Sequence, residues 1–385
     1  MSFDRTITLQ QPPRITFGAG CAADAVATFI RERSLRRAFV VTSPSVRHHA
    51  AAMAASLASL GVEICWADGE PAEPTLAAAE ALRDRVRAFA PDIVVAAGGG
   101  SVLDTAKVAA ALHDKPGPIS DYFGLNLVPA RRTALIAVPT TAGTGSEVSP
   151  NSILLDEASS TKKALISPAL VPDAAVVDPV LTLTLPPALT ATTGIDALTH
   201  CLEVYANLSA HAATDANALE GVRLIAADLP RAVSNGSDVA ARSAVALGSL
   251  YGGLGLGPVN TAAVHALAYP LGGEHHLSHG TSIALLLSHV VRFNAPAMPG
   301  RHAALSVALG ADARASVEEA ASECADRLDA LLRACDAPRG LGSCGIPRDA
   351  LPGLADAALG VTRLLRNNPR PVTRDDALRI YSAAF

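Results

Sequence analysis

The chain has 385 residues, enough for two or three domains, and half of them are hydrophobic while 17% are charged. This composition supports a sizeable core and excludes a chain that is disordered throughout. The net charge is −5, and no run rich in lysine or arginine stands out, so nucleic acid is not expected as the main partner.

The N-terminus, the hydropathy and the cysteines indicate where the protein is located. The first ten residues, MSFDRTITLQ, include Asp4 and Arg5 and lack the apolar core of a signal peptide. No stretch of 18 or more residues is continuously apolar, so we expect no transmembrane helix and no membrane partner. Six scattered cysteines without a CxxC pair are typical of reduced thiols, which favours a cytoplasmic protein.

The first half of the chain alternates between strand and helix patterns. Short β-branched or apolar runs predict strands at 36–43, 62–67 and 92–100, with amphipathic helical stretches between them. Such alternation is typical of a parallel sheet covered by helices, as in a Rossmann-like α/β fold. Further strands are predicted at 136–140, 152–155 and 174–178.

The second half is almost entirely helical in pattern. Long helices punctuated by Gly, Pro or Asn are predicted at 187–206, 212–232, 238–254, 259–269 and 280–292. The hydrophobic period changes within DPVLTLTLPP, and we place a domain boundary there, near residue 183. The sequence thus predicts an α/β domain over 1–183 and an all-helical domain over 184–385.

A glycine-rich turn follows the strand predicted at 92–100. Gly98, Gly99 and Gly100 would let the backbone approach a ligand closely, and Ser101 is placed to cap the next helix, whose N-terminus exposes free N–H groups. These features suit a pyrophosphate. A tight structural turn between strand and helix is the alternative.

A second small-residue segment, PTTAGTGSEVS, follows the strand at 136–140. It crowds four hydroxyl groups beside two glycines, and the hydroxyls belong to Thr140, Thr141, Thr144 and Ser146. The carboxyl ends of neighbouring parallel strands converge at the edge where ligands bind. The two segments together favour a dinucleotide-binding domain over two unrelated loops.

The helical half contains residues with the spacing of metal ligands. Asp196 and His200, in GIDALTH, lie one helical turn apart, and a simple Asp–His hydrogen bond is an equal alternative there. His265 lies on a short helix that we expect Pro270 to break, and His279 opens the next helix. One carboxylate and three imidazoles from three helices would suit a divalent transition metal such as Fe²⁺ or Zn²⁺.

Several long motifs occur in one order along the chain: GGGSVLDTAK, PTTAGTGSEVS, KALISPALVPDAAVVDP, GIDALTHCLE, and VHALAYPLGG followed after five residues by HG. In this order and spacing the chain resembles, over nearly its whole length, the iron-containing (group III) alcohol dehydrogenases, a family that includes lactaldehyde reductase and 1,3-propanediol dehydrogenase. The resemblance implies an N-terminal dinucleotide-binding domain, an all-helical metal and substrate domain, and an active site in the cleft between them.

The resemblance also implies roles for individual residues. The catalytic metal ligands would be Asp196, His200, His265 and His279. The pyrophosphate contacts would be Gly98, Gly99, Gly100 and Ser101, and the nicotinamide half of the cofactor would lie along Thr140, Thr141, Thr144 and Ser146. Lys162 would lie near a ribose, although the adjacent Lys163 leaves the register open by one residue.

Two positions depart from the family pattern. Tyr269 stands where many members carry a histidine proposed as a proton carrier; a tyrosine hydroxyl can still donate a hydrogen bond. Ser43 ends the second strand where NAD-preferring members often carry Asp, so NADP is as plausible as NAD. The alternative interpretation of Ser43 is a helix cap, and Arg47 is placed to approach a 2′-phosphate.

The expected function is therefore a metal-dependent, NAD(P)-linked oxidoreductase that interconverts a small primary or secondary alcohol and its aldehyde or ketone. The alternative is a maleylacetate reductase-type reduction of an oxo-acid, which the complete ligand set disfavours. We also expect a homodimer or a higher homo-oligomer. The glycines of 249–260 indicate either room for a substrate or tight helix packing.

Overall fold

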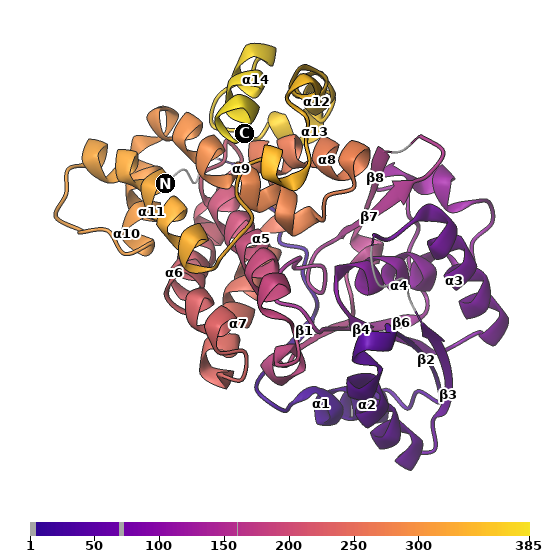
Figure 1. Ribbon diagram of the computed structural model, residues 1–385. Helices are drawn as coiled ribbons and strands as arrows, with labels where there is room; N and C mark the ends of the chain where they lie inside the picture. The colour runs from indigo at the N-terminus through magenta and orange to yellow at the C-terminus, as the bar shows by residue number, and fades with distance from the viewer. Residues whose placement is uncertain (1–4, 69–72, 160) are drawn as a thin grey trace. The chain divides into compact units, whose positions relative to one another are not determined.

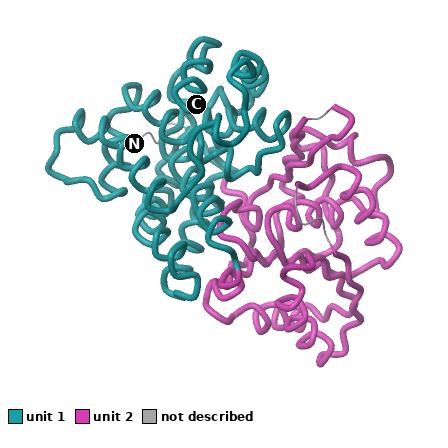
Figure 2. The backbone as a smooth tube through the Cα atoms, viewed as in Figure 1, with its two compact units in different colours: residues 1–8, 185–385 teal, residues 9–184 magenta. Residues whose placement is uncertain are grey.

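The computed structural model describes residues 5–68, 73–159 and 161–385. They form two compact units (Figure 2). We call residues 9–184 the α/β unit, and residues 185–385 with the described N-terminal residues up to Thr8 the helical unit. The units meet in sequence at Thr184 and Leu185, and the N-terminal segment, expected in the first domain, groups with the helical unit.

The main sheet of the α/β unit is parallel, as the sequence predicts (Figure 1). Within the described residues it has six strands in the order β1-β9-β6-β4-β2-β3. Their bounds are Arg14–Phe17 (β1), Arg37–Thr42 (β2), Glu63–Asp68 (β3), Ile93–Gly98 (β4), Ala134–Pro139 (β6) and Ala174–Val177 (β9). The central strands are apolar on both faces, because helices cover both sides of the sheet.

Two pairs of helices cover the opposite faces of this sheet. α1 (Ala22–Glu32) and α2 (Arg47–Ser59) pack on one face, against side chains that include Val40 and Val95. α3 (Leu76–Phe89) and α4 (Gly100–Leu112) pack on the other, against Phe39 and Val94 among others. Neighbouring strand residues therefore enter different cores, as the two-residue period of a strand requires.

The direction of winding reverses between β2 and β4, which pair directly. From β2 the chain moves to β3 at one edge, and from β4 it moves to β6 on the other side. Ligands of such sheets bind at the carboxyl ends of the strands where the winding reverses. The residues that follow β2 and β4 are therefore the ones that the fold places at a ligand site.

The strand predicted at 152–155 does not join the main sheet. β7 (Asn151–Asp156) pairs antiparallel with β8 (Thr161–Ile166), which pairs in turn with β5 (Gly124–Leu125). Short 3₁₀ turns occur at Pro44–Val46, Ile119–Tyr122, Pro168–Leu170, Pro179–Thr182, Ala295–Ala297, Gly342–Cys344 and Arg348–Ala350.

The helical unit contains no strand among its described residues. Its helices are α5 (Pro187–Tyr205), α6 (Ala212–Ser234), α7 (Val239–Leu256), α8 (Ala263–His275), α9 (His279–Asn294), α10 (Pro299–Ala308), α11 (Val317–Ala334), α12 (Leu351–Leu359), α13 (Thr362–Leu365) and α14 (Arg374–Ala383). α5 packs against α6, α7 and α9, and α8 packs against α9.

The glycines of α7 serve helix packing at the positions where they face α5. A Cβ at Gly252 would lie 3.0 Å from His200 Cβ, and a Cβ at Gly255 would lie 2.6 Å from Val204. The packing interpretation of these glycines is thus confirmed. In the described chain α7 is also the one helix long and apolar enough to cross a membrane, but 61% of it is buried inside the protein, as in a core helix.

The expected break at Pro270 is wrong. α8 continues through Pro270 and both following glycines and ends at His275. Proline removes one N–H from a helix interior and usually kinks it. Here Pro270 and Leu271 are buried. Tyr381 Oη also donates a hydrogen bond of 2.6 Å to the carbonyl of Leu267 in the same turn. Tertiary packing therefore outweighs the local preference of the sequence.

Candidate functional site

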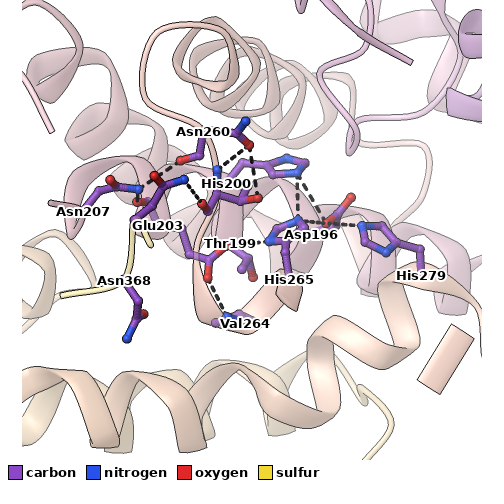
Figure 3. A network of polar contacts seen from close by, with 12 residues as sticks. Asp196, Thr199, His200, Glu203, Asn207, Asn260, Val264, His265, His279 and Asn368 are labelled. Carbon is purple, nitrogen blue, oxygen red and sulfur yellow. Dashed lines mark hydrogen bonds and ion pairs between the residues drawn. The ribbon is translucent and has the colours of Figure 1, made fainter. Parts of the chain in front are cut away.

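The four residues with metal-ligand spacing come together in the helical unit (Figure 3). α5 carries Asp196 and His200 one turn apart, α8 carries His265, and α9 begins at His279. Asp196 Oδ1 lies 3.7 Å from His200 Nε2, 3.4 Å from His265 Nε2 and 3.4 Å from His279 Nε2. We call these four residues the Asp–His cluster.

The Asp–His cluster fits a cation. Asp196 Oδ1 is buried and accepts a hydrogen bond from none of the described residues, a costly state unless another group satisfies it. Asp196, His265 and His279 each offer one ligand atom, and these atoms lie within 4.8 Å of one another. His200 Nε2 lies 3.1 Å from His265 Nε2. A set of one oxygen and three nitrogens suits Fe²⁺ or Zn²⁺.

The alternative, a simple hydrogen bond between Asp196 and His200, does not fit the distance between them. The distance of 3.7 Å between Asp196 Oδ1 and His200 Nε2 is too long for one. Asp196, His200 and His265 are buried, whereas the His279 side chain is 32% exposed. The cluster therefore reaches the surface of its unit on the His279 side.

The charges in the Asp–His cluster are strongly coupled. Burial opposes ionisation of Asp196, but the surrounding histidines outweigh it and hold the pKa of this carboxyl well below its usual range. Burial lowers the pKa of His200 to about 4, so its imidazole is neutral. Burial also disfavours protonated His265, but Glu203 and Asp196 raise its pKa to about 9. A cation that binds His265 must displace a proton.

Glu203 belongs to this site and was not identified from the sequence. Its Oε2 lies 2.6 Å from His265 Nδ1, and its Oε1 accepts a hydrogen bond of 2.6 Å from the backbone N–H of Val264. It lies seven residues after Asp196 on α5, two turns along the same helix face. A carboxylate at that spacing in an otherwise apolar helix is the signal that would have found it.

The other histidines near His265 and His279 in the sequence lie outside the Asp–His cluster. His275 is the last residue of α8, and His276 follows it in a left-handed conformation with φ of 58°. Tyr269 lies one turn after His265 on α8 and is half-buried. Its place on the face of α8 that carries His265 is the basis for a role near the metal.

The glycine turn of the α/β unit differs from expectation at Ser101. Gly99, not Ser101, is the N-cap of α4, and Ser101 lies inside the first turn. No side chain of the described residues caps this N-terminus. The first amides of α4 are therefore available to an anion such as a pyrophosphate.

The two small-residue segments lie against each other, as their strand positions predict. The backbone N–H of Thr140 donates a hydrogen bond of 3.0 Å to the carbonyl of Gly98. A Cβ at Gly100 would lie 2.6 Å from Thr144 Cγ2, so only glycine permits this approach. Thr140 is buried, and Thr141 and Thr144 are half-buried beside the turn.

Two of the predicted cofactor residues already have partners within the protein. The Ser146 hydroxyl donates to Asp104 Oδ1 and accepts a hydrogen bond of 3.1 Å from Lys107 Nζ. Lys162 Nζ lies 2.7 Å from Glu73 Oε1, and its side chain is 7% exposed. The neighbouring Lys163 pairs with Asp156 instead.

Ser43 directly follows β2, at the edge where the winding reverses. Its Oγ lies 3.1 Å from Ser45 Oγ and makes no capping bond to the turn Pro44–Val46 within the described chain. Arg47 Nη1 donates hydrogen bonds of 2.9 and 3.0 Å to the two carboxylate oxygens of Asp68, the last residue of β3. The sequence suggested no anionic group at this edge, but Asp68 is one, and it pairs with Arg47.

Comparison with known proteins identifies the family. The family model described as "Iron-containing alcohol dehydrogenase" matches residues 12–179, and the model described as "Fe-containing alcohol dehydrogenase family, C-terminal" matches residues 190–385. Together they span both units. The resemblance inferred from the motifs is therefore confirmed.

Curated relatives cover most of the chain. Sulfoacetaldehyde reductase of Bilophila wadsworthia is 35% identical over 97% of both chains. Long-chain-alcohol dehydrogenase 1 of Geobacillus thermodenitrificans is 42% identical over 76% of this chain and 75% of its own. Lactaldehyde reductase of Escherichia coli is 31% identical over 96% of this chain and 97% of its own.

Solved structures share the fold. A 1,3-propanediol oxidoreductase matches with a TM-score of 0.95 at 31% identity, over 99% of this chain and 100% of its own. A sulfoacetaldehyde reductase from Bifidobacterium kashiwanohense in complex with NAD⁺ matches with a TM-score of 0.88 at 27% identity, over 99% of each chain. On this evidence the chain belongs to the iron-containing alcohol dehydrogenases, a family of alcohol and aldehyde oxidoreductases.

Proposed function

We propose that this protein uses a divalent metal and a nicotinamide dinucleotide to interconvert a small alcohol and its aldehyde or ketone. The observation that carries the proposal is the convergence of three histidine Nε2 atoms, at 3.4 to 3.7 Å, on the buried Asp196 Oδ1, to which no described residue donates a hydrogen bond. A cation is the group that would satisfy this oxygen and the imidazole lone pairs together.

The metal would be held by Asp196, His200, His265 and His279. Fe²⁺ is the ion that the family name supports, and Zn²⁺ accepts the same donors. When bound, the metal supplies a Lewis acid that polarises the C–O bond of the substrate, and the nicotinamide supplies or accepts the hydride. The Tyr269 hydroxyl, one turn from His265, would donate a hydrogen bond toward the substrate oxygen.

The dinucleotide would bind at the carboxyl ends of β2 and β4. The uncapped amides of α4, with Gly98, Gly99, Gly100 and Ser101, would hold the pyrophosphate. The hydroxyls of Thr140, Thr141 and Thr144 lie beside that turn and would contact the nicotinamide half. The NAD⁺ complex of the Bifidobacterium sulfoacetaldehyde reductase supports NAD as the cofactor.

The preference between NAD and NADP depends on Ser43, Arg47 and Asp68. Ser43 carries no charge, so it would admit a 2′-phosphate as well as a ribose hydroxyl. Arg47 is the cation placed to bind that phosphate, but it is paired with Asp68. We therefore propose NAD as the main cofactor and NADP as a second one that competes with Asp68 for Arg47. Ser146 and Lys162 would hold the cofactor-binding segments in place through their bonds to Asp104, Lys107 and Glu73.

The substrate class follows from the relatives. Their names cover a sulfonated aldehyde, long-chain alcohols and lactaldehyde, which supports a carbonyl substrate of the aldehyde type. A maleylacetate reductase-type activity is the alternative, and the complete Asp–His cluster argues against it. All six cysteines lie in described residues as free thiols, which supports a cytoplasmic location. We also propose a homodimer or a higher homo-oligomer.

The test is a turnover assay on protein loaded with Fe²⁺ or Zn²⁺. NADH oxidation is followed with short aldehydes, 2-hydroxyaldehydes, sulfoacetaldehyde and an oxo-acid, and NAD⁺ reduction with the corresponding alcohols. We expect metal-dependent turnover of at least one aldehyde. Turnover of the oxo-acid alone would favour the alternative, and turnover that survives complete metal removal would contradict the proposal.

A further inference from the structure

We propose that Glu203 is a positioning residue that fixes the ring orientation and tautomer of His265 and so strengthens cation binding at the Asp–His cluster. The inference rests on the proposed metal site but goes beyond its ligand set. It assigns a role to a carboxylate that does not face Asp196 and that the proposed reaction does not otherwise use.

Both oxygens of Glu203 are committed to donors. Oε2 lies 2.6 Å from His265 Nδ1, and Oε1 lies 2.6 Å from the backbone nitrogen of Val264. The side chains of Glu203 and His265 are 7% and 4% exposed, so water does not compete for these bonds. A carboxylate can only accept, so the proton of this pair lies on His265 Nδ1.

A proton on Nδ1 leaves the lone pair of the neutral ring on Nε2. That atom lies 3.4 Å from Asp196 Oδ1 and 3.1 Å from His200 Nε2, on the side of the Asp–His cluster (Figure 3). Glu203 therefore selects the tautomer that can bind a cation and holds the ring in the plane that aims it there. Carboxylates that bind the outer nitrogen of a ligand histidine also make that ligand more basic.

Glu203 itself is held in place from both sides. Its carboxylate accepts the N–H of Val264, in the first turn of α8, where helix amides lack internal partners. Asn207, two residues beyond the end of α5, donates hydrogen bonds of 2.9 Å to the backbone carbonyl of Glu203 and 3.1 Å to that of Asn260. One carboxylate thus ties α5 to α8, the two helices that carry Asp196, His200 and His265.

Replacement of Glu203 by glutamine separates these roles. The amide has one oxygen and an NH₂ group, so it cannot accept from both Val264 and His265. If the oxygen serves Val264, the NH₂ group faces Nδ1 and favours the tautomer with its proton on Nε2. Loss of such a partner lowers metal affinity by roughly 10- to 100-fold.

The experiment compares Zn²⁺ affinity in the full-length protein after chelator treatment. Zn²⁺ is titrated against a competing chelator into the wild type, Glu203→Gln, Glu203→Asp and the control Glu220→Gln. Glu220 is an exposed carboxylate on α6 that pairs with Arg223. We expect roughly 10- to 100-fold weaker binding in Glu203→Gln, partial recovery in Glu203→Asp, which can still only accept, and no change in Glu220→Gln.

A structural role alone would give a different pattern. If Glu203→Gln lowered the Tm of the metal-free protein but bound Zn²⁺ as tightly as the wild type, the proposal would be overturned. If the wild type bound no Zn²⁺, the proposed metal site itself would be refuted, so the two failures are distinguishable.

A second measurement, on the wild type, tests the proposal even if Glu203→Gln fails to fold. Nitrogen NMR of the Zn²⁺-loaded wild type, labelled at histidine, reports which ring nitrogen carries the proton. The His265 signals are assigned by their loss in His265→Ala. We expect a protonated Nδ1 with a hydrogen bond to a carboxylate; a protonated Nε2 on His265 would overturn the proposal.

Discussion

Asp196 is the central residue of the Asp–His cluster. Three imidazoles face one oxygen of its carboxylate, and no described residue gives that oxygen a hydrogen bond. A buried carboxylate in this state destabilises a protein unless a cation or proton completes it.

His279→Ala should remove the metal without unfolding the protein. His279 is the most exposed of the four proposed ligands, and α9 is capped by Ser278, whose Oγ accepts the N–H of Thr281. We expect bound metal and turnover to be lost while NAD⁺ binding is kept. Elemental analysis and a cofactor titration decide this, and full metal occupancy in the variant would show that His279 is not a ligand.

Glu147 gives a pH-dependent prediction away from the metal. Burial raises the pKa of this carboxyl to about 7, although its usual value is 4.5. Between these pH values the unfolded chain has lost the proton and the folded chain keeps it, so stability falls as pH rises. Glu147→Gln should therefore gain stability over the wild type between pH 5 and pH 8, by about 3 kcal/mol at most.

The measurement is urea unfolding of both proteins at several pH values. The control is Glu318→Gln at an exposed position, for which the difference in unfolding free energy from the wild type should not change with pH. A gap that is the same at pH 5 and pH 8 for Glu147→Gln would mean that the folded protein does not hold this proton.

Asp68→Asn should shift the cofactor preference toward NADP. The substitution releases Arg47 from an ion pair whose side chains are 52% and 46% exposed, so the pair is worth about 1 kcal/mol at most. We expect the ratio of kcat/KM for NADPH to that for NADH to rise by up to about fivefold. Ser43→Asp should move the same ratio in the opposite direction; if neither variant changes it, the adenosine end is bound elsewhere.

At the scale of elements, the turn between β4 and α4 can be tested with one glycine. Gly99 has an ordinary φ of −75°, and a Cβ there would lie 3.4 Å from Thr141 Cγ2, so a larger residue is not strained by the backbone. Gly98 and Gly100 would clash with Val102 and Thr144 at 2.6 Å and are poor test sites.

Gly99→Val should therefore raise the cofactor KM at least tenfold with little change in Tm, because the added methyl groups would lie where the proposed pyrophosphate approaches the α4 amides. Gly353→Val, in open space on α12, is the control for valine at a helix glycine. An unchanged KM would mean that the glycine turn only joins a strand to a helix.

The elements with strong periodicity were predictable, and those set by tertiary contacts were not. β2, β3, β4 and the long helices of the second half follow their hydrophobic patterns. β1 was missed because it has only four residues, and β8 was missed because its sequence, TKKALI, begins with three polar residues. Both strands depend on pairing, β1 with β9 and β8 with β7. The predicted break at Pro270 and cap at Ser101 are wrong, because packing outweighs the local preferences of these residues.

The site residues that lie within recognisable sequence motifs could be predicted. Asp196, His200, His265 and His279 were found from spacing and resemblance, and the structure brings them together. Glu203 has a spacing signal on α5, but its partner on α8 is known only from the fold. The pair of Arg47 and Asp68 was not found, because it joins the start of α2 to the end of β3. Which groups are buried together is decided by the fold.

At the scale of the whole molecule, the residues proposed to bind the dinucleotide and those proposed to bind the metal belong to different units. The glycine turn, the threonine segment and Ser43 all lie within residues 9–184, and the Asp–His cluster lies within residues 185–385. The family models divide the chain in the same way, at 12–179 and 190–385. Loss of metal should therefore leave dinucleotide binding largely intact, and changes at the glycine turn should leave metal content unchanged.

The central claim is that one cation binds between Asp196 and the three histidines. The most direct measurement is anomalous diffraction from crystals of the iron-loaded protein, collected on both sides of the iron absorption edge. The account predicts one strong peak about 2.0–2.2 Å from Asp196 Oδ1 and from the Nε2 atoms of His200, His265 and His279. A catalytically active, iron-loaded protein whose only anomalous peak lies away from these four residues would contradict it.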